Sequence, residues 1–197
     1  MNVSSTLQLL HRRINEIRVE NADTKRFVPE NELDNVMTRD VVAKLVGDFT
    51  PFDRTEEVVD FIIKGARKVF GILILINHVG GIHHFIHRDQ LQTRRTDDLL
   101  PLPKAAIQEI LNDNYLADLF HEKQWEFCAP VFSGRMIPRT FERQTILPYL
   151  ADGFLSAGAF GSVHRIEIHP SHRPDGLCAT SGVGTSGIIW RIVADDG

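Results

Sequence analysis

The sequence of 197 residues has few cysteines, no long apolar run and no strong charge of either sign. Its two cysteines, Cys128 and Cys178, are too few and too far apart for a disulfide framework or a cysteine-based zinc site. The longest apolar run, Val69 to Ile76, is well short of the roughly 20 residues that cross a bilayer. A formal net charge of −4 creates no positive field for nucleic acid or an anionic membrane. These absences predict a protein with neither nucleic-acid nor membrane partners.

The N-terminus lacks the apolar core of a signal peptide, because Arg12, Arg13 and Glu16 interrupt its leucines. We therefore expect a soluble, intracellular protein of the cytoplasm or nucleus. The apolar content of 43% and charged content of 24% are ordinary for a globular protein. The length fits one domain, or one domain with part of another.

The first 120 residues have the apolar periodicity of α-helices. The strongest helix is expected from Glu56 to about His78, with its second half buried in the middle of a bundle. Pro103 should start a later helix that continues or restarts before Phe120. Four other helices are expected. One carries Leu7 to Ile17 after a cap at Ser4 or Ser5, one is Glu30 to Met37, one carries Val41 to Val46 between a cap at Thr38 and a stop at Gly47, and one is Ile82 to about Gln90.

Two patterns in this part resemble chemical sites, and we reject both. His83 and His87 have the one-turn spacing of helical metal ligands, but no third ligand with a defined spacing accompanies them. His87-Arg88-Asp89 spells a kinase catalytic tripeptide, but Arg94 stands where that loop needs its asparagine. We expect no metal site and no catalytic residue here.

After Lys123 the sequence changes character. Gln124 to Phe132 is aromatic and interrupted by Pro130, which predicts an edge strand or an ordered linker. Thr145 to Leu150 is a second extended piece, which runs directly into a hairpin. The expected organisation is a helical region at 1–135, an extended linker at 136–150, a hairpin at 151–175 and a glycine-rich tail at 176–197 with a possible short strand. The expected fold class is α+β, mainly α.

The hairpin, from Gly153 to Ile168, is the segment with an identifiable chemistry. Gly158, Gly161 and Val163 fit the second glycine, third glycine and valine of the G-x-G-x-x-G-x-V loop that binds ATP phosphates in kinases, with Ser156 at the first glycine. Glycines let a backbone approach a phosphate closely. An ordinary glycine-containing hairpin is the alternative. The candidate nucleotide-binding residues are Ser156, Gly158, Ala159, Phe160, Gly161 and Val163.

A hairpin of two strands is marginally stable alone. Its apolar side chains must therefore pack on the helical region or stay loose; they are Phe154, Phe160, Ile166 and Ile168. Strand alternation places Val163, Arg165 and Glu167 on one face and His164, Ile166 and Ile168 on the other.

Three segments follow one another in an order that carries a family resemblance: Phe120 to Phe132, Ile146 to Tyr149, and Gly158 to Pro170. Together they resemble fungal protein-kinase-domain proteins with a long helical extension before the kinase lobe. The resemblance implies a serine/threonine-kinase ancestry, with ATP and Mg²⁺ as cofactors and protein hydroxyls as substrates. The hairpin would correspond to the first two strands of the kinase small lobe.

The chain departs from this family after the glycine loop. No lysine follows Lys123, and the sequence contains no Asp-Phe-Gly. The 40 positions from Gly158 to Gly197 cannot hold the rest of a kinase. A strand over Ile188 to Val193 would place Arg191 near the kinase lysine position, where arginine is a poor replacement. We therefore expect a truncated, catalytically incomplete kinase-like protein. The alternative is a helical module that binds protein partners or regulates them, without nucleotide.

Overall fold

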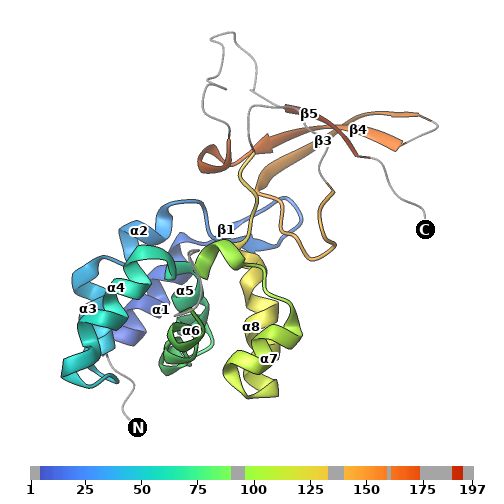
Figure 1. Ribbon diagram of the computed structural model, residues 1–197. Coiled ribbons are helices and arrows are strands. Elements are labelled where there is room, and N and C mark those ends of the chain that lie inside the picture. Colours follow the sequence, from blue (N-terminus) through green and yellow to red (C-terminus); the bar gives the residue numbers. More distant parts are fainter. Residues whose placement is uncertain (1–4, 90–95, 133–139, 159–160, 174–187, 193–197) are drawn as a thin grey trace.

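The computed structural model describes residues 5–89, 96–132, 140–158, 161–173 and 188–192, with the backbone alone described at 87–89, 157–158, 161–163 and 188–192. These residues form a helical region followed by a three-stranded antiparallel sheet (Figure 1). The predicted class, α+β and mainly α, is confirmed. The α-helices are α1 (Ser5–Ile17), α2 (Glu32–Val36), α3 (Arg39–Gly47), α4 (Thr55–Gly65), α5 (Arg67–Leu75), α6 (Ile82–Asp89), α7 (Lys104–Leu111) and α8 (Asn114–Lys123).

The helix α5 lies at the centre of the helical region, with α1, α2, α4, α6 and α8 among its neighbours. Its residues Val69, Phe70, Ile72, Leu73 and Ile74 are fully buried, as their nearly all-round apolar pattern predicted. The main core forms around them and includes side chains from α1 to Phe127.

The expected single helix from Glu56 to His78 is wrong, because the chain breaks into α4 and α5. Ala66 leaves helical geometry there, with φ −134° and ψ 25°. The new helix begins where the carboxylate of Asp97 accepts the backbone N–H groups of Lys68 and Val69, each at 3.0 Å. Those N–H groups have no partner within a helix, so the distant carboxylate stabilises the start of α5.

Turn chemistry explains the other interruption. Asn112 adopts a left-handed conformation, with φ 49°, after α7. Asp113 then accepts a hydrogen bond from the N–H of Leu116 and caps α8. Of the two predicted possibilities, a continuation or a restart, the structure has the restart. The helix expected over 30–37 is shorter, because Pro29 precedes α2 by three residues instead of starting it.

A small hairpin in the helical region was not expected from the sequence. Its strands are β1 (Val19–Glu20) and β2 (Arg26–Phe27), which pair antiparallel. The segment Gln124–Phe127 is a 3₁₀ helix, so the extended structure expected from Gln124 is wrong for its first four residues. Residues 128–132 belong to no helix or strand, so of the two predicted alternatives for this segment the edge strand is not observed there.

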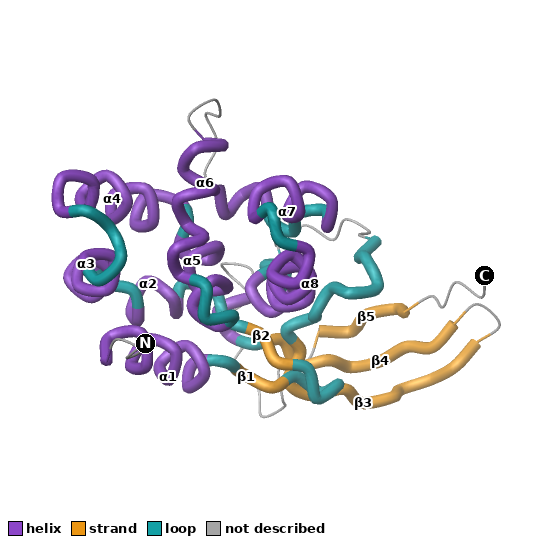
Figure 2. Tube along the Cα trace, turned by 90° about the horizontal axis from the view of Figure 1, so that it is seen from below, coloured by secondary structure: helices purple, strands orange, loops and turns teal. Residues whose placement is uncertain are grey.

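The large sheet has the order β3–β4–β5, formed by β3 (Tyr149–Gly158), β4 (Gly161–Ile168) and β5 (Ile188–Ile192). All neighbouring strands are antiparallel. The hairpin and the third strand were both predicted. Figure 2 shows this sheet to one side of the helices, connected to them at the end near β1 and β2.

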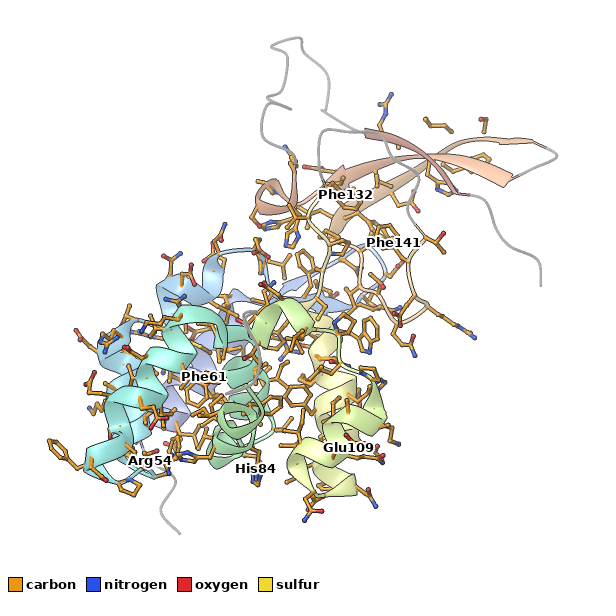
Figure 3. All side chains as sticks on the ribbon, in the orientation of Figure 1. Arg54, Phe61, His84, Glu109, Phe132 and Phe141 are labelled. Carbon is orange, nitrogen blue, oxygen red and sulfur yellow. The ribbon has the colours of Figure 1, made fainter. Side chains whose placement is uncertain are left out.

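Aromatic side chains of the linker cover one face of the sheet close to this connection. Ile166 and Ile168 are buried against Phe132, and Phe141 packs on the same cluster. Figure 3 shows Phe132 and Phe141 between the sheet and the helices. These two isoleucines therefore pack on the linker, which supplies the partner that the hairpin needed.

Candidate functional site

The candidate residues lie at the far end of the β3–β4 hairpin. The backbone of Gly158 pairs with Gly161, and Ser156 pairs with Val163. Ala159 and Phe160 lie outside the described residues. The structure thus brings four of the six candidate positions together in one ladder.

The strand β5 adds a third position beside this turn. Its register places Arg191 opposite Val163 and Ile192 opposite Ser162. Within the described part of the chain, lysine occurs only in the helical region, since Lys123 is the last lysine of the sequence. Arg191 is accordingly the cationic residue that β5 contributes beside Val163.

The two faces of the hairpin have different surroundings. Ile166 and Ile168 face the linker cluster, whereas Arg165 on the opposite face is exposed. Nearer the turn, His164 Nδ1 and Asp152 Oδ1 are 2.7 Å apart across the two strands. Phe154 remains 63% exposed and contacts the ring of His164 edge-on. Of the two outcomes expected for Phe154, packing on the helices is therefore not observed.

Asn21 joins the small hairpin to the start of β3. Its Nδ2 donates to the carbonyl of Leu147 at 2.9 Å, and its Oδ1 accepts the N–H groups of Asp23 and Lys25. The N–H of Ala22 also donates to the carbonyl of Tyr149. Asn21 is 5% exposed, so its side chain makes these hydrogen bonds away from solvent.

His172 forms a second connection, directly after β4. It ends the 3₁₀ helix Pro170–His172 and is fully buried. Its ring lies within hydrogen-bond distance of the N–H of Glu30 and the carbonyl of Pro130, both at 3.1 Å. Its carbonyl accepts the N–H of Phe132. The position of the sheet on the helical region therefore depends on polar contacts as well as on the aromatic cluster.

A cavity of about 190 Å³ lies beside these contacts, with Glu30, Arg67, Lys68 and Asp97 among its lining residues. Burial raises the pKa of Asp97 to about 6, and a shifted carboxyl in a cavity is a common mark of a functional site. The carboxylate of Asp97, however, already accepts two backbone hydrogen bonds at the start of α5. The volume is also below the roughly 300 Å³ at which ligand pockets begin. We interpret Asp97 as a structural residue.

The remaining reactive groups do not form a site. Among the residues that the structure describes, no three His, Cys, Asp or Glu side chains are grouped as metal ligands. His83 contacts the hydroxyl of Thr50, and residues 87–89 form the end of α6. Burial raises the pKa of Cys128 to about 12, which keeps its thiol protonated and unreactive at neutral pH.

Sequence reasoning missed Asp97, Asn21 and His172. Asp97 and Asn21 had weak local signals: an acidic pair follows Thr96, and Asn21 precedes a short polar turn. His172 belongs to His-Pro-Ser-His, which indicates a turn but no partner. The contacts that give these residues their roles join segments far apart in the chain.

Comparison with models of protein families, with curated proteins and with solved structures finds no match. Within the described residues, no helix is both long enough and apolar enough to span a bilayer. The kinase resemblance therefore stays a prediction, and the arguments for function rest on the hairpin itself.

Proposed function

We propose that this chain is kinase-like and binds nucleotide, and that its 197 residues do not transfer phosphate by themselves. The observation that carries the proposal is the β3–β4–β5 meander with paired glycines at its first turn and Arg191 opposite Val163. A kinase small lobe begins with the same sequence of elements, in which the glycine turn covers the phosphates and the third strand supplies a cation. The hairpin face that bears exposed Arg165 would receive the nucleotide.

The lack of phosphate transfer follows from the residues that this chemistry requires. A kinase holds the α- and β-phosphates with a lysine, and it binds Mg²⁺ through an aspartate and an asparagine near its catalytic aspartate. These 197 residues contain no lysine beyond Lys123 and no Asp-Phe-Gly. Arg191 would attract phosphate, but its planar guanidinium does not reproduce the compact charge of lysine.

A thermal-shift titration of the full chain with Mg²⁺ and a non-hydrolysable ATP analogue tests the proposal. A ligand at 100 times its Kd stabilises the folded state by about 2.7 kcal/mol, which raises Tm by several degrees. The variant Gly161→Pro should lose this shift, because proline removes an N–H and restricts the turn. Gly80→Ala is the matched control, since Gly80 is exposed and a Cβ there meets no atom within 4 Å.

The outcome separates the proposal from its alternative. A shift that is retained by Gly80→Ala and lost by Gly161→Pro supports nucleotide binding at the hairpin. A flat titration, or an equal shift in all three proteins, contradicts it. Transfer of labelled phosphate to the chain itself or to a protein substrate would contradict the predicted inactivity.

A helical protein-interaction module is the second candidate function. The main core favours it, because all of that core lies between Leu7 and Phe127. The helical region is thus packed without any residue of the large sheet. A flat nucleotide titration, together with a partner whose binding survives Gly161→Pro, would support this function.

A further inference from the structure

The contacts of His172 require one protonation state of its ring. A backbone N–H can only donate, so Nε2 must accept from Glu30. A carbonyl can only accept, so Nδ1 must carry the hydrogen and donate to Pro130. The ring is therefore neutral, with its hydrogen on Nδ1. A second proton, on Nε2, would point at the N–H of Glu30 and abolish that hydrogen bond.

The surroundings of His172 favour this neutral form. The ring is fully buried and meets the ring of Phe27 edge-on, with centroids 5.3 Å apart. The charged and titratable groups that act on it are Glu30, Lys68 and His169. Of these three groups, Glu30 alone favours protonation of His172. The carboxylate of Glu30 also lies 3.3 Å from Nζ of Lys68. Burial is the main cause that lowers the pKa of His172, assisted by His169 and Lys68.

The segments joined by His172 belong to different parts of the fold. Glu30 precedes α2 in the helical region, Pro130 and Phe132 belong to the linker, and His172 itself follows β4. The N–H of His169 also donates to the carbonyl of Pro148. A change at this one ring therefore acts on the attachment of the hairpin, which also depends on the contacts of Asn21 and on the cluster around Phe132.

We propose that His172 is a protonation-sensitive latch, which holds the β3–β4 hairpin against the helical region at neutral pH and releases it on acidification. This regulation goes beyond nucleotide binding and does not depend on it. It would make the position of the hairpin respond to acidification in the range where histidine titrates.

The direction follows from proton linkage. In the released state His172 would titrate near the ordinary value of about 6.5, whereas in the docked state its pKa is lower. The released state therefore binds a proton first as the pH falls. Docking should weaken by about fivefold over the first pH unit below about 6.5, and the slope then approaches tenfold per unit until the docked histidine also becomes protonated.

Nuclear magnetic resonance of the full ¹⁵N-labelled chain tests the His172 latch without a mutation. At pH 7.5 the ring signals of His172 should show a neutral imidazole with its hydrogen on Nδ1. Protection of the Glu30 and Phe132 amides from exchange, corrected for the intrinsic rate, should fall by up to about fivefold between pH 6.5 and 5.5. The amide of Phe70, which donates to the carbonyl of Ala66 within the core, serves as the internal reference.

Two variants assign the effect to one residue. His172→Gln keeps an oxygen that can accept from Glu30 but does not titrate, so protection should lose most of its dependence on pH. His169→Gln should keep most of the pH dependence, because among the described residues the His169 ring hydrogen-bonds to Ser171 of its own turn. Burial also lowers the pKa of His169, so this variant measures the smaller share that His169 contributes.

The latch is contradicted by a hydrogen on Nε2, by wild-type protection that does not change with pH, or by a pH dependence that is as steep in His172→Gln as in the wild type. If His172→Gln does not fold, the ring signals and the wild-type protection still decide the question.

Discussion

Phe70 on α5 and Phe154 on β3 have the same side chain in opposite surroundings. Phe70 is fully buried, whereas Phe154 is 63% exposed. The same contrast applies to the regions around them, because the helices enclose one large core and the sheet has a small cluster at its attached end. Apolar burial thus stabilises the helical region, while the sheet depends on backbone pairing and on its junction.

This difference indicates how each region should respond to perturbation. A change in the helical core should lower the stability of the whole chain. A change at the junction should release the sheet and leave the helices folded, since local openings follow the weakest contacts of a structure. Three further experiments test this comparison.

The largest effect is expected from Phe70→Ala. Removing a fully buried aromatic side chain leaves a cavity and should cost about 3–5 kcal/mol in the free energy of unfolding. Urea denaturation followed by far-ultraviolet circular dichroism measures it. Phe154→Ala is the matched control, and a change of less than about 0.5 kcal/mol is expected because that ring is mostly exposed. Equal losses in the two variants would refute the comparison.

A smaller effect is expected from the buried carboxyl of Asp97. Its pKa is raised to about 6 in the folded protein, above the value of about 3.9 in an unfolded chain. The folded state therefore binds a proton more tightly, and this contribution is full below about pH 4 and lost as the pH rises to about 6. The loss is at most about 3 kcal/mol.

The variant Asp97→Asn isolates this contribution. It should remove the decrease in stability between pH 4 and 6, as measured by the urea midpoint at each pH. Asp98→Asn, at the exposed neighbouring position, should keep that decrease. The interpretation fails if the pH profile of Asp97→Asn is parallel to that of the wild type.

The smallest of the three effects is expected at the junction, from Asn21→Ala. The change leaves the carbonyl of Leu147 and two N–H groups without their partner, at a cost of about 2 kcal/mol. Hydrogen exchange should increase in β3 and β4 more than in α5. Asn35→Ala is the control, because Asn35 is exposed and its contact with Glu32 is long, at 3.5 Å. Uniform exchange in sheet and helices would show that the two regions unfold together.

Local patterns predicted much of this fold. The apolar periodicity predicted most of the helices, and the glycines at 158 and 161 predicted the hairpin, because both signals lie within one element. The burial of α5 followed from a segment that is apolar on nearly all sides. The ladder that places four candidate residues together also follows from the strand pattern around the two glycines.

The missed features depend on distant partners. Gly65 and Ala66 look like the interior of a helix until Asp97, 28 positions beyond Val69, caps the helix that follows. Each strand of the small hairpin has two residues, too few to show any alternation. The hydrogen bond between Glu30 and His172 spans 142 positions, and no local pattern in the chain indicates it.

The small hairpin also has a consequence for synthesis on the ribosome. Asn21 leaves the ribosome long before Leu147, its partner 126 positions later. At about 5–20 residues per second, this separation corresponds to a wait of roughly 6–25 s. Phe27 also lacks its packing partners during this time, because the other members of its core cluster are Trp125, Ala129 and Ile146. The nascent helical region therefore carries an uncovered aromatic side chain until the linker emerges, and chaperones have that interval in which to bind it.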